Sequence, residues 1–339
     1  MSTIRKKINA YAKLLRLPGL GGLAIPPVIG ALSVGVHNDL YGLLMLFVIG
    51  AFSAIFGFVL NDYADVELDT LVKDLHGKPL VSGDIPRKHA LAISFLCVLF
   101  AFFFVMILWW GKTLDDLKLL AFIGIFLAGV LGTMYNLYGK KMAGTDFLVA
   151  LSMALVFLFG ALSFGTPTLL TWVIFILTFN QTLHMNAVEG GIKDADHDFI
   201  MGVNNIALAS GVKVEGTNIF IPLRFKAFGM GIRLCSAVLI FVPFIFYPSK
   251  YQIWNVILMA LFIAGVLYLS IKLLTIKTFN RGKIQKLIGT QTFLRYSIVP
   301  IMLIPFVDLW IALILIVFPL AWYIVLTPLI GERLFRPRM

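Results

Sequence analysis

Long apolar runs, separated by short polar connections, constrain this chain more than any other feature of its sequence. About 20 apolar residues in an α-helix cross the core of a bilayer, and such a helix satisfies its own backbone hydrogen bonds where no water is present. The pattern predicts an all-α, polytopic membrane protein with a single transmembrane domain over residues 1–339. The apolar runs cover residues 20–37, 41–60, 90–110, 117–138, 147–165, 168–188, 228–247, 252–275, 290–307 and 309–329.

The composition and the two ends of the chain fit this class. Hydrophobic residues make up 60% of the chain and charged residues only 13%, whereas soluble proteins are about one quarter charged. Pro300, Pro305 and Asp308 interrupt the last two runs, so residues 290–329 form either one broken span or a tight hairpin of two. The N-terminal segment, residues 1–18, is basic and amphipathic, and we expect it to lie on the membrane surface.

The distribution of basic residues predicts the orientation. The chain has 28 Lys and Arg residues and a net charge of +11. With ten spans and a cytoplasmic N-terminus, only Lys112, Lys118 and Lys250 fall on the outer side of the membrane. The positive-inside rule therefore favours this arrangement in the cell membrane. It places the two long connections, residues 62–89 and 189–227, on the cytoplasmic side as cap loops. Charges spread over membrane loops also argue against a nucleic-acid partner.

The stretch LNDYADVELDT, residues 60–70, puts a cluster of carboxylates directly after an apolar run. Asp62, Asp65 and Asp69 are spaced i, i+3, i+7, so they share one face if the helix of that run continues past residue 60. Like charges on one face repel, so we expect cationic side chains nearby. Asn61 adds a neutral oxygen ligand, and oxygen-only ligand sets suit Mg²⁺ or Ca²⁺.

A second cluster, EGGIKDADHD at residues 189–198, follows another apolar run on the same side of the membrane. Asp194 and Asp198 are spaced i, i+4. Two such clusters can each hold one Mg²⁺, and together the two ions can bind a diphosphate and stabilise it as a leaving group. The apolar bundle behind them can hold a hydrocarbon tail. The pattern therefore favours an allylic diphosphate as substrate.

Polar residues around the two clusters extend the predicted site. Any of the nearby lysines is able to contact diphosphate oxygens as a point charge; these are Lys78, Lys140, Lys141 and Lys193. Asn180 and His184, late in the sixth run, either line a cavity for an acceptor or form hydrogen bonds between helices. Glu189 either faces the cavity or pairs with a basic loop. We expect solvated side chains at Glu67, Asp196 and His197.

The chain resembles the UbiA superfamily of intramembrane prenyltransferases. Residues 61–69 match its motif N-D-x-x-D-x-x-x-D, and KDADHD resembles its D-x-x-x-D motif through Asp194 and Asp198. KPLVSGDI, residues 78–85, resembles R-P-L-x-x-G with Lys in place of Arg. YNLYGKK, residues 135–141, resembles a Tyr/Lys segment with one residue more in its spacing, which leaves open the role of Tyr135 and the choice between Lys140 and Lys141.

The resemblance implies both a fold and an activity. The fold is a bundle of nine core transmembrane helices around a central cavity, with residues 309–329 as an additional tenth helix. Both aspartate motifs face the cavity under a cytoplasmic cap. The implied activity is Mg²⁺-dependent transfer of a prenyl group from a polyprenyl diphosphate, with Tyr135 among the residues that bind the diphosphate.

Two questions about function stay open at this point. The acceptor is either an aromatic quinone precursor or the hydroxyl group of geranylgeranylglyceryl phosphate. A phosphorylated acceptor calls for the lysines named above, and an aromatic one calls for polar groups such as Asn180 and His184. The alternative from another class is a secondary transporter that uses the aspartates as ion sites. Against it, the carboxylates lie at the ends of spans, and those spans lack paired Gly/Pro breaks.

Overall fold

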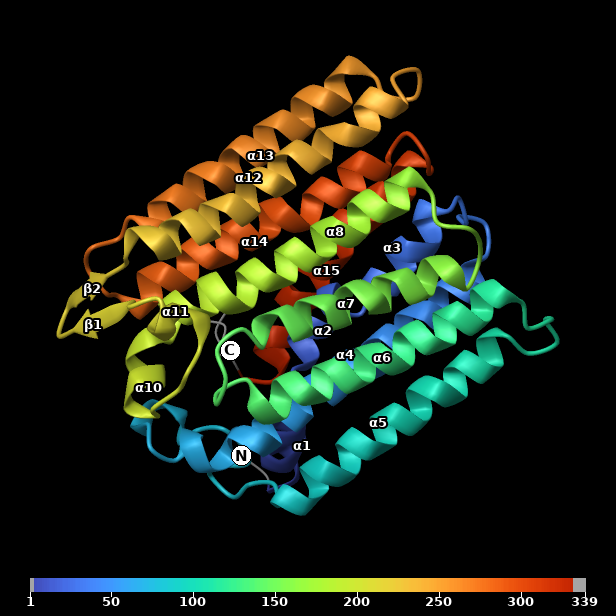
Figure 1. Ribbon diagram of the computed structural model, residues 1–339. Coiled ribbons are helices and arrows are strands. Elements are labelled where there is room, and N and C mark those ends of the chain that lie inside the picture. Colours follow the sequence, from blue (N-terminus) through green and yellow to red (C-terminus); the bar gives the residue numbers. More distant parts are fainter. Residues whose placement is uncertain (1–2, 332–339) are drawn as a thin grey trace.

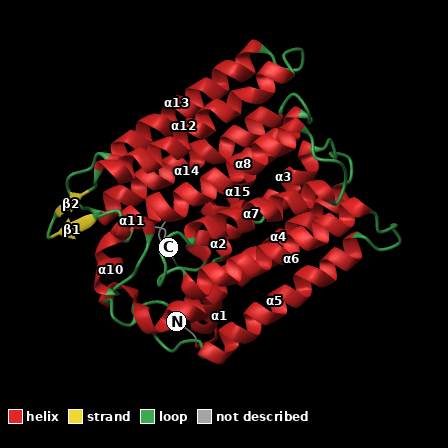
Figure 2. Ribbon diagram, viewed as in Figure 1, coloured by secondary structure: helices red, strands yellow, loops and turns green. Residues whose placement is uncertain are grey.

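The computed structural model describes residues 3–331, which form a bundle of long helices with one short β-hairpin (Figure 1). The long helices run side by side, and the loops near the hairpin gather with α10 and α11 at one end of the bundle (Figure 2). The long helices are α4 (Leu40–Asp69), α5 (Arg87–Leu108), α6 (Asp116–Tyr138), α7 (Asp146–Leu162), α8 (Leu169–Leu183), α12 (Leu223–Phe246), α13 (Ile253–Leu274), α14 (Arg281–Leu303) and α15 (Leu309–Leu329). The shorter elements are α1 (Thr3–Leu14), α2 (Leu17–Leu23), α3 (Pro26–Ser33), the 3₁₀-helix η1 (Lys73–Leu75), the π-helix η2 (His184–Gly190), α9 (Gly191–Lys193), α10 (Ala195–Ile200), α11 (Ile206–Ala209), β1 (Lys213–Glu215) and β2 (Asn218–Phe220).

The predicted apolar runs are helical over most of their length, and most of them are long enough to span a bilayer. By length and composition, seven stretches within residues 3–331 qualify: Ile4–Ser33, Leu40–Asp69, Arg87–Leu108, Asp116–Tyr138, Leu223–Phe246, Ile253–Leu274 and Leu309–Leu329. α7 and α8 are shorter, with 17 and 15 residues, and α14 begins with a charged segment. The membrane class is therefore confirmed, and the count of ten spans stays a prediction.

A pair of prolines divides the first apolar run, whereas Pro300, expected to interrupt the run from residue 290, lies inside α14 and does not end it. Residues 20–37 do not form one helix, because Pro26 and Pro27 begin α3 and α2 ends before them. Proline lacks an N–H donor and clashes with the preceding turn, so it can start a helix but rarely continues one. At the other end, α14 stops at Leu303, and α15 starts after Asp308. Residues 290–329 are thus a hairpin of two helices.

α4 carries the first carboxylate cluster on a continuous helix of 30 residues. Its N-terminus is capped by the side chain of Asp39, which accepts a hydrogen bond from the Gly42 amide at 2.8 Å. Residues 61–69 contain neither proline nor glycine, so nothing in the sequence stops the helix after the apolar run. The loop that we expected from residue 62 therefore begins only at Thr70, and a rigid helix holds the aspartates.

The outward faces of the bundle are apolar. Large side chains such as Phe95, Phe103, Phe126, Val238 and Leu261, on α5, α6, α12 and α13, are 53–69% exposed. Exposed apolar surface on this scale marks contact with a partner or with lipid. In a chain with these helices, it is the surface that faces the acyl chains.

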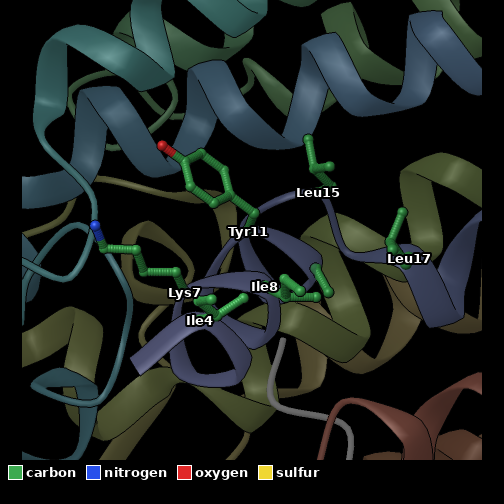
Figure 3. Close-up of a pocket in the computed structure, with 7 residues that line it drawn as sticks. Ile4, Lys7, Ile8, Tyr11, Leu15 and Leu17 are labelled. Carbon is green, nitrogen blue, oxygen red and sulfur yellow. The ribbon is translucent and has the colours of Figure 1, made fainter. Parts of the chain in front are cut away.

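An open apolar groove runs along α1 (Figure 3), lined by Ile4, Lys7, Ile8, Tyr11, Ala12, Leu15 and Leu17. The other side of α1 packs on the core, where Leu14 is buried against Leu80 and Ile85. The predicted position of this segment on the membrane surface stays a prediction. α1 also packs against the connection after α4, and Arg16 follows α1 near the carboxylates.

α3 and α7 pack closely through two glycines, which gives a first prediction. A Cβ on Gly160 would lie 1.8 Å from the Pro27 carbonyl oxygen, and a Cβ on Gly30 would lie 2.1 Å from the Phe157 carbonyl oxygen. Small residues permit such close approach between membrane helices. We expect Gly160→Ala to lower the free energy of unfolding by about 1–3 kcal/mol, the cost of overpacking.

Thermal unfolding in detergent measures this effect. Gly129→Ala is the matched control, since a Cβ at Gly129 on α6 meets nothing within 4 Å. Equal melting temperatures for the two variants would contradict the close contact between α3 and α7.

Candidate active site

The last turns of α4 present three aspartates on one face, as the spacing predicted. Asp62, Asp65 and Asp69 are all buried, and Asn61 is half-buried beside them. Glu67, on the opposite face, is exposed and pairs with Arg87 at 2.9 Å. The spacing therefore separates one solvated carboxylate from three that point into the protein.

Two of the predicted lysines lie between these aspartates. Lys78 Nζ lies 2.7 Å from Asp69 Oδ2 and 3.3 Å from Asp62 Oδ1. Lys140 Nζ, just beyond the end of α6, lies 3.0 Å from Asp65 Oδ2 and 3.7 Å from Asp69 Oδ1. Burial lowers the pKa of Lys78, but the charges of Asp62 and Asp69 outweigh it and raise that pKa. Both lysines thus lie within ion-pair distance of the aspartates.

Lys141 lies apart from this group. Its side chain is exposed, and it forms none of the ion pairs found among residues 3–331. Lys140 has the contacts that the sequence allowed for either lysine. Lys140 is therefore the lysine that lies beside the aspartates, and its contact with the diphosphate stays a prediction.

Arg16 joins the first cluster, although no sequence motif predicted that it would lie there. Its Nη2 lies 3.3 Å from Asp62 Oδ1, and its guanidinium lies 4.6 Å from the centre of the Phe58 ring. Arg16 has a φ of 48° at the junction between α1 and α2. This left-handed conformation costs a residue other than glycine about 1–2 kcal/mol. The cost is offset where tight packing and an ion pair hold the side chain in place.

A π-helix and a short α-helix lie between α8 and the second motif. α8 passes into the π-helix η2, then α9, and the regular helix breaks at Asp194 before α10. The Asp198 amide donates to the Asp194 carbonyl at 2.8 Å, so the two aspartates stand one turn apart. Asp198 is buried, and its Oδ2 accepts a hydrogen bond from Asn205 Nδ2 at 2.7 Å.

Cations also surround Asp194. Lys193 Nζ lies 3.1 Å from Asp194 Oδ2, and Arg281 Nη1, at the start of α14, lies 3.1 Å from Asp194 Oδ1. Arg281 also pairs with Asp196. Asp196 is therefore paired as well as partly solvated, and Arg281 is a further residue that the sequence did not single out.

The prediction of a surface position for His197 is wrong. The side chain is buried, and its Nε2 lies 3.5 Å from Asp74 Oδ2, on the connection after α4. The short helix α10 lies against that connection, where Val72 packs with Met201 and Val203. A histidine in a polar segment carries no sequence signal for such a long-range contact.

The two motifs share one electrostatic environment. The pKa of the Asp198 carboxyl is raised to about 7, chiefly by burial and then by the charge of Asp194, with a further contribution from Asp65 on α4. The charge of Lys140 acts in the opposite direction. The end of α6 links the motifs, since the Asn204 amide donates to the Lys140 carbonyl at 2.9 Å. The aspartates of α4 and those after α8 therefore face a common polar region.

Tyr135 lies near this region and contacts η2, which precedes the second motif. Its side chain is within reach of the charges of Asp65, Asp198 and Arg16. Its hydroxyl donates to Asn186 Oδ1 at 3.4 Å. Tyr135 thus joins α6 to η2, next to the two aspartate motifs.

Asn180 and His184 form contacts between helices. Asn180 Nδ2 donates to Ser236 Oγ at 3.3 Å, on α12. His184 is fully buried, with Nδ1 3.1 Å from Glu189 Oε1 and 2.8 Å from Arg233 Nη2. Glu189 pairs with Arg233 and with Arg295 of α14. Of the two alternatives weighed for Asn180 and His184, the structure has hydrogen bonding between helices, and Glu189 pairs with buried arginines of neighbouring helices.

Comparisons with known proteins identify the family and the relatives of this chain. The model of the UbiA prenyltransferase family matches residues 23–290, a segment that includes both aspartate motifs. The chain is 28% identical over 215 residues to the 4-hydroxybenzoate octaprenyltransferase of Vibrio campbellii, which covers 61% of this chain and 71% of that protein. It is 28% identical over 253 residues to the digeranylgeranylglyceryl phosphate synthase of Saccharolobus solfataricus, which covers 70% of this chain and 84% of that protein.

Solved structures share the fold. A UbiA homologue from Archaeoglobus fulgidus, bound to GPP and Mg²⁺, has a TM-score of 0.62 at 18% identity and covers 88% of this chain and 99% of its own. A structure of digeranylgeranylglyceryl phosphate synthase has a TM-score of 0.62 at 20% identity and covers 91% of this chain and 99% of its own. The bundle described above is therefore the fold of these membrane proteins.

The family match decides between the two classes of function that the sequence left open. It extends over most of the chain, and the relatives named above are prenyltransferases and not transporters. The chain is thus an enzyme that transfers prenyl groups, and it belongs to the UbiA prenyltransferase family.

Proposed function

We propose that the two aspartate motifs bind the diphosphate of a polyprenyl diphosphate through two Mg²⁺ ions. Asn61, Asp62, Asp65 and Asp69 hold one ion, and Asp194 and Asp198 hold the other. The observation that carries this proposal is the polar region that both motifs face. In it, the negative charge of Asp65 on α4 helps to raise the pKa of Asp198, which lies beyond α8.

The side chains present fit a hard cation. Asp69 Oδ1 is buried and accepts no hydrogen bond from the described residues. Its contact is the ion pair with Lys140 Nζ at 3.7 Å, so this carboxylate oxygen still has the capacity to bind a cation. Within residues 3–331, no three His, Cys, Asp or Glu side chains enclose an ion by themselves. Mg²⁺ needs no such cage, because it is commonly bound by one or two carboxylates with substrate phosphates and water. When bound, Mg²⁺ stabilises the negative charge that develops on the leaving diphosphate.

The lysines and the arginine of the first cluster assist the diphosphate. Lys78, Lys140 and Arg16 now neutralise the aspartates at 2.7–3.7 Å, and in the substrate complex they turn to the diphosphate oxygens, with Lys193 and Tyr135 beside them. The C1–O bond of the allylic diphosphate breaks, and its electron pair leaves with the diphosphate. The acceptor then forms a bond to C1 and loses a proton.

The polar groups favour one of the two acceptor classes. The relatives in the comparisons carry the names of both, an aromatic acid prenyltransferase and a glyceryl phosphate synthase. Asn180 and His184, which an aromatic acceptor would use, are engaged between helices. Cations such as Lys193 and Arg281 lie at the second motif. We infer that this arrangement suits geranylgeranylglyceryl phosphate better than an aromatic acid.

We place the protein in the cell membrane with the N-terminus and both aspartate motifs on the cytoplasmic side. The support for this is the distribution of lysines and arginines between the connections of the chain. A diphosphate and a phosphorylated acceptor are then within reach from the cytoplasm, while the prenyl tail stays among the apolar helices.

The raised pKa of Asp198 predicts how the metal affinity depends on pH. Burial and nearby negative charges favour the protonated carboxyl below about pH 7, so Mg²⁺ must displace a proton there. Above pH 7 the carboxylate is already ionised and the affinity levels off. We expect the KM for Mg²⁺ to be about tenfold higher at pH 6 than at pH 8, because one pH unit below a pKa leaves about one tenth of the group ionised.

Initial rates at several Mg²⁺ concentrations measure this dependence. Asp198→Asn is the control, since it should bind Mg²⁺ weakly at both pH values. A wild-type KM for Mg²⁺ that is the same at pH 6 and pH 8 would contradict the role of Asp198 as a ligand.

An assay of prenyl transfer with the purified protein in detergent tests the proposed function. The protein is incubated with radiolabelled geranylgeranyl diphosphate and Mg²⁺, with geranylgeranylglyceryl phosphate or with hydroxylated aromatic acids, and each reaction is repeated with EDTA. We expect a labelled product with the glyceryl phosphate that is lost with EDTA. A product with the aromatic acids alone would overturn the inferred acceptor and keep the enzyme class. Product formation that resists EDTA would overturn the metal sites.

A further inference from the structure

A buried ionic network joins η2 to α12 and α14, and it contains none of the aspartates of the two motifs. Glu189 Oε1 lies 2.8 Å from Arg233 Nη2 and 3.1 Å from His184 Nδ1, and Arg295 Nη1 pairs with the same oxygen. Arg233 Nη1 also donates to Gln181 Oε1 at 3.1 Å. Glu189, His184, Arg233 and Arg295 are each at most 6% exposed. Burying these charges costs desolvation free energy, so we looked for the role that the network has in the protein.

Stability alone does not explain the network. Replacing a buried ion pair with well-packed apolar residues is often neutral or stabilising. Several polar atoms of the network also have no hydrogen-bond partner among the described residues, among them Glu189 Oε2, Arg233 Nε and Arg295 Nε. The best-attested use of such a costly network is to fix one arrangement of the chain among several.

The arrangement fixed here is the π-helix η2, His184–Gly190. In an α-helix, residues five apart point about 140° away from each other, since each residue adds about 100°. His184 and Glu189 are five apart, and yet their side chains are in contact. The i→i+5 bonding of a π-helix brings such residues together. The network and the wide turn therefore depend on each other.

The wide turn lies directly before the second motif. Gly190 is followed by α9 (Gly191–Lys193) and then by Asp194. A π-bulge adds one residue to a turn, so its loss would rotate everything after it by about 100° around the helix axis. α14 holds this segment at two points, through Arg295 on Glu189 and through Arg281 on Asp194.

We infer that Glu189, held by Arg233 and Arg295, is a positioning residue for the metal ligands Asp194 and Asp198. It sets the direction of these carboxylates by fixing the π-turn, and it touches neither the metal nor the substrate. This inference rests on the proposed metal role of the second motif. Groups that orient metal ligands without binding the metal typically change metal affinity by about 10- to 100-fold when they are replaced.

The test measures metal binding apart from activity. Mn²⁺ alone is titrated into the full-length protein in detergent and followed by electron paramagnetic resonance, and the KM for Mg²⁺ is measured in parallel. For Glu189→Gln, which keeps the shape and removes the charge, we expect both the Mn²⁺ dissociation constant at one site and the KM for Mg²⁺ to rise at least about tenfold. The kcat at saturating Mg²⁺ should recover to near that of the wild type. Glu215→Gln, on the exposed strand β1, is the matched control and should behave as the wild type.

A pair of arginine variants keeps the test decisive if Glu189→Gln fails to fold. Arg295→Lys retains the charge beside Glu189 and should bind Mn²⁺ nearly as the wild type does, while Arg295→Met should weaken binding as Glu189→Gln does. A purely structural role would lower the melting temperature of these variants and leave the Mn²⁺ affinity of the folded protein unchanged, and that result would overturn the inference.

Asp194→Asn separates this inference from the proposal on which it rests. If Asp194→Asn weakens Mn²⁺ binding and Glu189→Gln does not, the positioning role is wrong and the metal site stands. If Asp194→Asn binds Mn²⁺ as the wild type does, the metal site itself is wrong, and the positioning role fails with it.

Discussion

Asp65→Asn is expected to lower the rate of prenyl transfer by about 100- to 1,000-fold, the usual loss when one group that stabilises developing charge is removed. The substitution keeps the shape of a buried side chain whose Oδ2 lies 3.0 Å from Lys140 Nζ. It removes the negative charge that we propose binds the metal, and its amide group presents hydrogens to a lysine that needs an acceptor. Initial rates at saturating Mg²⁺ and prenyl diphosphate measure the loss.

Glu67→Gln is the matched control for Asp65→Asn. It is the same kind of change two residues further along α4, on a side chain that is exposed and pairs with Arg87. We expect its rate to stay within about twofold of the wild type, as is usual for surface substitutions of small energetic effect. A normal rate for Asp65→Asn, or equal losses for the two variants, would contradict the metal role of the buried face.

Lys140→Met should lower the rate of prenyl transfer by about 100-fold, whereas Lys141→Met should cost at most a few-fold, a difference typical of removing one charge from a preorganised site. Lys140 lies between Asp65 and Asp69. Its positive charge also lowers the pKa of Asp198. Without it, the aspartates of both motifs repel one another, and the diphosphate loses a cation. The side chain of Lys141 is exposed.

Rates for the two variants, measured side by side, check this assignment, because the substitutions are identical and adjacent. Melting temperatures of the two proteins serve as the control for folding. A greater loss for Lys141→Met than for Lys140→Met would contradict the placement of the lysines in the site.

The local part of the site could be predicted because helical spacing is a local property. The i, i+3, i+7 positions of Asp62, Asp65 and Asp69 fix one face as soon as α4 continues, and repulsion on that face calls for cations, which Lys78 and Lys140 provide. Spacing also identified Glu67 as a solvated side chain. The membrane class followed from the apolar runs alone.

The long-range part could not be predicted in the same way. Arg16 reaches Asp62 across 46 residues and Arg281 reaches Asp194 across 87, and no local pattern connects such pairs. The positive-inside rule also accounts for basic residues in these segments, and that interpretation concealed their contacts.

Departures from regular helices account for the remaining differences. The 3.6-residue period does not foresee the π-helix His184–Gly190, which turns Glu189 toward His184 and two arginines. Nor does composition foresee that His197, in a polar segment, is buried against the connection after α4. The division of residues 20–37 into two helices does have a local signal, because proline commonly begins a helix and Pro26 begins α3.

Binding of radiolabelled geranylgeranyl diphosphate tests most directly whether both motifs hold one diphosphate through Mg²⁺. It is measured by equilibrium binding to the wild type, Asp65→Asn and Asp194→Asn, each with Mg²⁺ and with EDTA. We expect tight binding to the wild type with Mg²⁺, and weak binding with EDTA or when either motif is changed. Binding that is equally tight in EDTA, or that depends on only one of the two motifs, would contradict the account.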